Sequence, residues 1–196
     1  MRIIVFMSVT LDGVLQAPGR PDEDGRGGFR HGGWAIPYAD SVMGQFAGES
    51  MGKSGSLLLG RRTYEDFFKV WPNRTDNPYT QVLNNTRKYV VSRTLEEPLP
   101  WQNSTLLKGE AAETVARLKR QPGKDLVVLG SGQLVQTLMQ SGLVDEYVLM
   151  IHPLVLGSGH HLFNEGWSIT LRLVDSRTTT TGVLLATYRP SAEVAA

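Results

Sequence analysis

The chain has 196 residues, of which 41% are hydrophobic and 20% are charged, and this composition fits one ordinary globular domain with a sizeable core. Its formal net charge of +1 gives no global field that would attract nucleic acid or an acidic membrane surface. Cysteine is absent, which excludes disulfides, thiolate nucleophiles and cysteine-ligated metals and fits a cytoplasmic location.

Apolar patterning predicts strands that alternate with helices along most of the chain. The apolar run at the N-terminus is too short for a signal peptide or a membrane span, so we interpret it as the first strand. Strands are expected at 2–10, 56–59, 87–91, 104–107, 126–129 and 144–151, helices at 37–51, 62–70, 111–120 and 132–141, and an antiparallel pair within 168–189 that turns near Thr181 and Gly182.

This alternation predicts the α/β class, with a mixed, mostly parallel sheet flanked by helices and a C-terminal antiparallel hairpin. No internal repeat or linker is visible, so we expect a single domain at 1–190 and a tail at 191–196. The segment 16–33 is rich in Gly, Pro, Asp and Arg and nearly lacks apolar residues, which predicts a long loop. Such loops are often lids or binding loops; an ordered lid would favour an enzyme.

One predicted strand exit carries two arginines. The strand 56–59 is followed by Gly60, and Arg61 and Arg62 then begin a helix. The helix dipole prefers anions at this end, so paired guanidinium groups make sense if an anion binds between them and the exposed N–H groups. The alternative is that both arginines are solvated surface residues.

Two further strands end in similar turns. The strand 87–91 leads to Ser92 and Arg93, whose hydroxyl and guanidinium could bind a phosphate ester, and the strand 126–129 leads to the Gly-Ser-Gly turn 130–132 before a helix. Ligands bind beyond the carboxyl ends of parallel strands, so we expect three such exits to converge on one ligand. The alternative is that they are ordinary exits from strands.

A set of motifs occurs in a characteristic order. The motifs are SVTLDG at 8–13, LGRRTYE at 59–65, VSRT at 91–94, VLGSGQL at 128–134 and, from 145 onward, DEY, HP, LGSG and LF. This ordered set resembles the reductase domain of bifunctional riboflavin-biosynthesis proteins, which belongs to the dihydrofolate-reductase-like superfamily. The resemblance covers nearly the whole chain and implies a three-layer dihydrofolate-reductase-like fold with an NADPH site.

The resemblance also implies which residues hold the cofactor. It assigns the adenosine 2′-phosphate and pyrophosphate side to Gly60, Arg61, Arg62 and Thr63, the adenosine half to Ser92 and Arg93, and the pyrophosphate and nicotinamide to Gly130, Ser131, Gly132, Gln133 and Leu134. Superfamily members often have two adjacent glycines at the third exit, where this chain has Ser131 as the second residue. Because a 2′-phosphate needs cationic partners, the arginines favour NADPH over NADH.

Two aspartates are candidates for the substrate side. Asp12 follows the first strand, where the family places a motif near nicotinamide and substrate, although it could merely shape a turn. The segment 34–40 loosely resembles the entry to the substrate helix of dihydrofolate reductase, so Asp40 is a candidate proton donor or pterin anchor, or only a favourable dipole partner. Side chains of adjacent strand residues point apart, so we expect no metal at His160 and His161.

The implied function is an NADPH-dependent reductase that transfers hydride to a (phosphoribosylamino)pyrimidine-like or related heterocycle. The sequence contains no zinc-binding His and Cys signature of the deaminase domain that precedes the reductase domain in the bifunctional proteins. We therefore expect a reductase that stands alone, and its substrate could differ from that of the bifunctional proteins. The alternatives are a dihydrofolate or pteridine reductase and a protein that binds NADPH without turnover. The family further implies a homodimer through the C-terminal strands.

Overall fold

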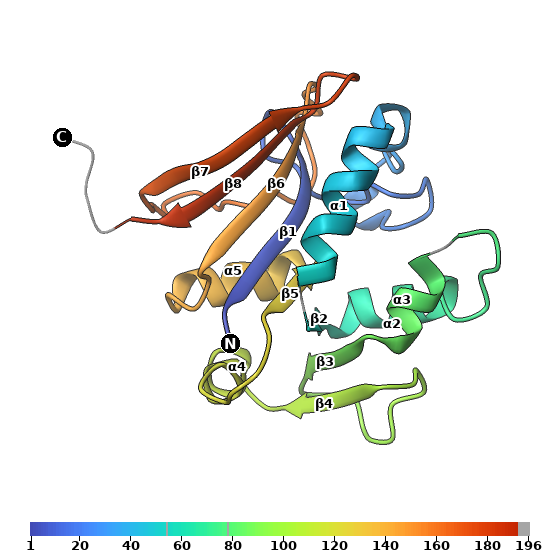
Figure 1. Cartoon of the computed structure of the whole chain (residues 1–196), viewed down its shortest axis with the longest axis vertical. Helices are drawn as coiled ribbons and strands as arrows, with labels where there is room; N and C mark the ends of the chain where they lie inside the picture. The colour runs from blue at the N-terminus through green and yellow to red at the C-terminus, as the bar shows by residue number, and fades with distance from the viewer. Residues whose placement is uncertain (54, 78, 192–196) are drawn as a thin grey trace. The chain divides into compact units, whose positions relative to one another are not determined.

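The computed structural model describes residues 1–53, 55–77 and 79–191, and it confirms the predicted α/β class. Its eight strands form a mixed, mostly parallel sheet with flanking helices and a C-terminal antiparallel hairpin (Figure 1). The chain divides into two compact units, of which the first holds residues 1–3 and 53–143 and the second holds residues 4–52 and the chain from 144 onward. The predicted tail lies outside the described residues, apart from Ser191. No helix in the described ranges is long and apolar enough to cross a membrane.

The first unit contains four parallel strands in the order β4, β3, β2, β5. They are β2 (Ser56–Gly60), β3 (Arg87–Ser92), β4 (Ser104–Lys108) and β5 (Leu126–Leu129). Leu57, Leu58 and Leu59 are fully buried, as expected for a strand with a parallel neighbour on each side. All four strands are confirmed to within one residue at each end.

Four helices accompany these strands: α2 (Arg61–Val70), α3 (Tyr79–Asn85), α4 (Ala111–Lys119) and α5 (Gly132–Gln140). α2 packs on β2 and β3, α4 packs on β3 and β4, and α5 packs on β2 and α4. The sequence predicted three of these helices and missed α3. Only Thr80 and Leu83 of α3 are buried, and seven residues are too few for a periodic apolar pattern.

A buried lysine holds the C-terminal end of α3. Lys88 in β3 has no exposed surface, and its Nζ donates hydrogen bonds to the carbonyl oxygens of Leu83 and Thr86, each 2.7 Å away. The same nitrogen lies 4.3 Å from the ring centroid of Trp101, which is a cation–π contact. Burial lowers the pKa of Lys88 to about 8, because removal from water disfavours the charged form.

The lowered pKa of Lys88 predicts that the protein gains stability as the pH rises from about 8 to 10.5. In this range the unfolded chain keeps the lysine protonated while the folded protein has released the proton, so raising the pH favours folding. Over this pH range, we expect the free energy of unfolding of the wild-type protein in urea to rise relative to that of Lys88→Met. The methionine variant has no titrating group at this position. A difference between the two proteins that stays constant over this range would contradict the low pKa.

The second unit contains the strands β1, β6, β8 and β7, in that order (Figure 1). Their bounds are β1 (Ile3–Thr10), β6 (Glu146–His152), β7 (Leu171–Thr178) and β8 (Leu184–Pro190). β1 and β6 are parallel, and β6, β8 and β7 are antiparallel to one another in turn. The predicted strands and hairpin are confirmed, although β6 begins two residues later than expected, and Thr181 and Gly182 lie in the hairpin turn.

The helix predicted at 37–51 is wrong at its N-terminal end. Ile36–Tyr38 form a short 3-10 helix, η2, and α1 (Ser41–Lys53) starts only after it. Ala39 between them is extended, with φ −65° and ψ 129°, so no continuous helix can pass through this position. α1 lies along β1 in Figure 1, and the ring of Phe46 stacks on that of Phe6.

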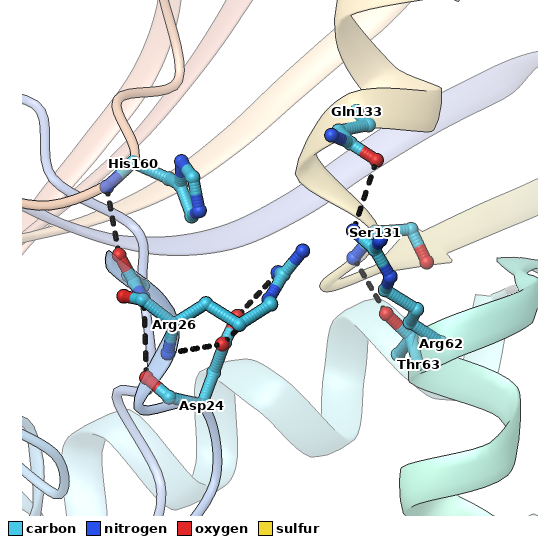
Figure 2. A network of polar contacts seen from close by, with 8 residues as sticks. Asp24, Arg26, Arg62, Thr63, Ser131, Gln133 and His160 are labelled. Atoms are coloured by element: carbon cyan, nitrogen blue, oxygen red, sulfur yellow. Dashed lines mark hydrogen bonds and ion pairs between the residues drawn. The ribbon is translucent and has the colours of Figure 1, made fainter. Parts of the chain in front are cut away.

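The long loop predicted between the first strand and the first helix is confirmed as irregular, with one short 3-10 helix, η1 (Arg26–Gly28). It is folded around the side chain of Gln16, which is only 3% exposed. Gln16 Nε2 donates to the carbonyl oxygens of Asp24 and Arg26, each at 3.0 Å, and Oε1 accepts from the backbone N–H of His160 at 3.0 Å. Figure 2 shows the Asp24, Arg26 and His160 side of this network. A buried amide therefore helps to order a loop that has few apolar residues.

Candidate functional site

The carboxyl ends of β2, β3 and β5 leave the same edge of the first unit's sheet. β2 lies between the other two strands, with Gly60 in register with Val91 of β3 and Leu58 in register with Val128 of β5. The three exits singled out in the sequence are therefore neighbours. This edge of an open parallel sheet is where α/β proteins bind ligands.

Ser131 connects the first and third exits. Its Oγ accepts a hydrogen bond from the backbone N–H of Gly60, and its own N–H donates to Thr63 Oγ1, both at 3.0 Å (Figure 2 shows the second bond). Ser131 has φ 59° and ψ 42°, in the left-handed region that favours glycine. Serine therefore keeps the backbone that a second glycine would adopt at this turn, and its hydroxyl ties the two exits together.

The helices that begin at these two exits lack side-chain caps. Neither Gly60 before α2 nor Ser131 before α5 makes a side-chain capping hydrogen bond, and neither helix has an acidic residue in its first turn. The first N–H groups of a helix have no partner within the helix and carry its positive dipole end. Both helix starts are therefore suited to bind an anionic group.

Among the described residues, the arginines at these exits make exposed contacts that contribute little to stability. Arg61 lies 3.5 Å from a glutamate one helical turn later, and Arg62 Nη1 lies 3.4 Å from Gln133 Oε1 (Figure 2). Arg93 at the middle exit pairs with Glu110 at 3.1 Å, and both side chains are exposed. Exposed pairs of this kind contribute little to stability, so each guanidinium can turn toward a bound phosphate at small cost.

Two further residues of the predicted cofactor site, Ser92 and Leu134, are buried within the fold. Ser92 is buried, and its Oγ accepts hydrogen bonds from the backbone N–H groups of Thr94 and Leu95, which closes the turn after β3. Leu134 is also buried, in the apolar face of α5. Gly130 is tightly packed, since a Cβ there would lie 3.1 Å from the side chain of Thr63.

In the second unit, Asp12 holds the segment that follows β6. Its carboxylate accepts hydrogen bonds from the hydroxyl of Thr10 and from the backbone N–H groups of Leu156 and Gly157, the last at 2.7 Å. These bonds, with that from Thr10 the strongest, lower the pKa of Asp12 to about 2. Near neutral pH the group is therefore an ionised hydrogen-bond acceptor.

We expect Asp12→Asn to lower the free energy of unfolding by about 1–2 kcal/mol, because charge-assisted bonds are replaced by neutral ones. The folded-state pKa lies below the ordinary value of 3.8, so the carboxylate stabilises the fold above that pH and loses its effect as the pH falls toward 2. Thermal unfolding of wild type and variant should therefore converge at low pH. Asp22→Asn, at an aspartate whose side chain is 85% exposed, is the matched control. A gap that persists near pH 2 would mean that packing, and not charge, is lost.

Asp40 caps α1 and also holds the hairpin turn. Its Oδ1 accepts a hydrogen bond from the backbone N–H of Met43 at 2.8 Å. Its Oδ2 accepts from the backbone N–H of Thr180 at 2.7 Å and from the hydroxyl of the same residue at 2.6 Å. The Thr180 hydroxyl is the main cause that lowers the pKa of Asp40. A carboxylate that stays ionised is better suited to accept hydrogen bonds than to donate a proton.

The adjacent histidines take part in backbone pairing with the residues after β1. The N–H of Leu15 donates to the carbonyl oxygen of His160 at 2.9 Å, and His161 forms an isolated antiparallel bridge with Val14. Within 1–53, 55–77 and 79–191, no three His, Cys, Asp or Glu side chains are grouped so that they could hold a metal ion. These backbone contacts, together with the bond from the His160 N–H to Gln16 Oε1, connect this segment to the residues that follow β1.

His152, at the end of β6, is a candidate that residue types and spacing did not single out. The side chain has no exposed surface, and its Nδ1 lies 2.9 Å from the carbonyl oxygen of Met150 and 3.3 Å from that of Val9. Its Nε2 is buried and has no hydrogen-bond partner within 1–53, 55–77 and 79–191. The sequence shows only a histidine before a proline, a pattern that does not distinguish a buried ring from an exposed one.

The arrangement of strands and helices is a dihydrofolate-reductase-like fold. A putative riboflavin biosynthesis protein from Shewanella sp. PV-4 is similar with a TM-score of 0.69 and 24% identity, covering 97% of this chain and 99% of that one. Dihydrofolate reductase from Enterococcus faecalis, complexed with NADP(H), is similar with a TM-score of 0.62 and 12% identity over 96% of each chain. At these identities the likeness shows the fold, which confirms the predicted one.

Residues 1–185 match the family model of the RibD C-terminal domain, and the chain therefore belongs to this family. The uncharacterized protein YyaP from Bacillus subtilis (strain 168) is 31% identical over 193 residues, which cover 95% of this chain and 94% of that protein. The family resemblance drawn from the ordered motifs is confirmed.

Proposed function

We propose that this protein is an NADPH-dependent reductase that acts on a nitrogen heterocycle. Its membership in the RibD C-terminal domain family supports an oxidoreductase. The observation that carries the proposal is the edge of the first unit's sheet, where Arg61 and Arg62 adjoin the uncapped starts of α2 and α5. Guanidinium groups and free helix N–H groups both favour phosphates.

The residues at this edge fit a dinucleotide with several phosphates. We propose that the two helix starts hold the pyrophosphate and that Arg61 and Arg62 hold the 2′-phosphate, with Ser92 and Arg93 beside the adenosine half. The segment 130–134 would line the pyrophosphate and the nicotinamide, as the family resemblance implies. NADPH supplies the hydride when it is bound, so the chain's task is to bind, orient and exclude water.

The proposed substrate is a (phosphoribosylamino)pyrimidine-like heterocycle, with dihydrofolate or a pteridine as the alternative. Asp12 and Asp40 carry lowered pKa values, so we propose that they accept hydrogen bonds from ring N–H or amino groups. A hydride acceptor also needs one proton to complete the reduction. With both carboxylates ionised at neutral pH, we propose that this proton comes from water.

Asp40→Asn should lower kcat/KM for the heterocycle about tenfold, because a charge-assisted hydrogen bond to the substrate is weakened. Thr180→Val is the matched control. It removes the hydroxyl that donates to Asp40 from the hairpin turn, and it leaves the carboxylate of Asp40 in place. Turnover of Asp40→Asn that equals the wild-type value at every pH would remove Asp40 from the site. An equal loss in both variants would assign the effect to the hairpin turn.

The proposed cofactor is tested by titrating the purified protein with NADPH and, in parallel, with NADH while recording fluorescence. Tight and selective binding of NADPH is expected, and it would justify a screen of pyrimidines and pterins as substrates. Failure to bind either nucleotide would overturn the reductase proposal. Binding without oxidation by any heterocycle would favour the second candidate, a non-catalytic NADPH-binding protein.

A homodimer through the C-terminal strands is also proposed. In the described residues β7 pairs only with β8, and Leu173 and Val174 on it are 50% and 40% exposed. An open strand edge with apolar side chains favours pairing with a second copy. Light scattering during size exclusion should give twice the mass of the chain, and a monomer at all concentrations would contradict this.

A further inference from the structure

We propose that Nε2 of His152 accepts a hydrogen bond from an N–H group of the heterocyclic substrate, which makes His152 a specificity-determining residue. The inference rests on the proposed function and adds a residue to it. It begins from a buried imidazole nitrogen that has no hydrogen-bond partner among the residues that the structure describes. Buried polar atoms are nearly always paired, so an exception at the end of a strand calls for an explanation.

The contacts of the ring fix its tautomer. Nδ1 faces two carbonyl oxygens, those of Met150 and Val9, and carbonyl oxygens can only accept. Nδ1 must therefore carry the proton, which leaves Nε2 of the neutral ring with a lone pair and no hydrogen. Burial lowers the pKa of His152, which keeps the ring neutral. The orphaned atom is thus an acceptor, and only a donor can satisfy it.

The position of His152 in the sheet points to a ligand. β1 and β6 are parallel neighbours, and His152 is in register with Thr10 at the carboxyl end of β1. Ligands of α/β sheets bind beyond such ends. Asp12, a predicted substrate residue, follows two residues after Thr10. The two proposed hydrogen-bond acceptors, Asp12 and His152, therefore lie at the same end of the β1–β6 strand pair.

Two aromatic rings cover the imidazole, and they differ in how firmly they are held. Trp34 lies edge-on at 5.1 Å between ring centroids, is buried, and donates its Nε1 hydrogen to the carbonyl oxygen of Gln16 at 2.7 Å. Tyr38 lies edge-on at 5.5 Å, is half-buried, and belongs to the three-residue helix η2. We therefore expect the Tyr38 ring to turn aside when a ligand reaches Nε2, while Trp34 stays as a flat wall beside a planar heterocycle.

The unpaired state has an energetic cost that a ligand removes. A buried acceptor without a donor destabilises the unliganded protein, and a substrate N–H placed at Nε2 would remove this cost. A heterocycle that offers only acceptors at that position gains nothing. His152 would therefore select aminopyrimidine-like or pterin-like rings that present an N–H group.

Nitrogen-15 NMR of protein labelled at histidine tests the proposal directly, with 5,6-diaminouracil and dihydrofolate as probes. In the free protein, Nε2 of His152 should be unprotonated and Nδ1 protonated. Addition of a probe should shift the Nε2 signal toward that of a hydrogen-bonded acceptor, while His31→Asn, the control at another histidine of the second unit, leaves this shift unchanged. A proton on Nε2 in the free protein, or an Nε2 signal that neither probe moves, would overturn the proposal.

Two variants separate the ligand role from a structural one. His152→Asn keeps a donor near the Nδ1 position and lacks the Nε2 acceptor, so it should weaken 5,6-diaminouracil about tenfold and leave NADPH affinity unchanged. Tyr38→Ala removes the ring that is expected to turn aside, so this variant should bind 5,6-diaminouracil at least as tightly as wild type. This second variant keeps the test valid if His152→Asn folds poorly. Equal probe affinity in wild type and His152→Asn would overturn the role of His152. If the wild-type protein does not bind NADPH, the proposed function is overturned. The shift of the Nε2 signal on addition of a probe would still test the role of His152 in that case.

Discussion

Replacing Arg61 and Arg62 together with alanine is expected to weaken NADPH binding roughly 100-fold and to leave NADH binding nearly unchanged. The 2′-phosphate is the group that distinguishes the two nucleotides, and guanidinium groups are its natural partners. To bind the 2′-phosphate, Arg61 gives up a contact of 3.5 Å to Glu65, and Arg62 gives up one of 3.4 Å to Gln133. Both contacts are weak, so breaking them takes little from the binding energy. Fluorescence titration of wild type and double variant with both nucleotides measures the effect.

Arg87→Ala is the matched control for this experiment. It removes an exposed guanidinium from the start of β3, whereas Arg61 and Arg62 follow the end of β2, and those two strands are parallel. The control should leave both affinities within about twofold of wild type, since it changes net charge by only one unit at a distance. Equal losses of NADPH and NADH in the double variant would remove the argument for a 2′-phosphate site.

Much of the first unit follows from the sequence because its strands are apolar on both faces and end abruptly. The run 126–129 is the clearest case, since four apolar residues between a charged pair and a glycine turn leave room for little else than a buried strand. An element that is too short to show a periodic apolar pattern cannot be predicted from the sequence. α3 is too brief for a repeat, and its end is held by Lys88, a residue whose charge would suggest a surface position. Tertiary contacts decide such elements.

The start of α1 shows a different limit. Proline is tolerated in the first turn of a helix, so the sequence allows a helix from 37 onward, but the chain is extended at Ala39 and begins the helix only after Asp40. The bonds from Thr180 to Asp40 join residues 140 positions apart. No local pattern contains such a contact, so neither the boundary nor the second partner of Asp40 could be read in advance.

The candidate site divides in the same way. The three strand exits were found because parallel topology places successive carboxyl ends together, and the structure makes them neighbours. Gln16 and His152 were missed because their importance depends on burial: one amide orders the long loop, and one imidazole lacks a partner for Nε2. The identity of a single polar residue does not indicate in the sequence that its side chain will be enclosed.

Ser131→Ala is expected to lower the free energy of unfolding by about 2 kcal/mol, because it removes the hydroxyl that accepts from Gly60 and takes this partner away from a partly buried N–H. Ser131→Gly loses the same hydroxyl but suits the left-handed backbone, at φ 59°, which costs a residue with a Cβ roughly 1 kcal/mol. We therefore expect the glycine variant to be more stable than the alanine variant by about 1 kcal/mol in urea unfolding.

The matched control is Thr63→Val, which removes the acceptor for the N–H of Ser131 and leaves the backbone conformation untouched. If all three variants lose equal stability, the left-handed turn is not strained and the hydroxyl bonds alone connect the two exits. If the glycine variant also retains NADPH affinity while the alanine variant loses it, the conformation of the turn is what the cofactor requires. Serine then serves this turn as glycine does, because its hydroxyl offsets the strain of the backbone it adopts.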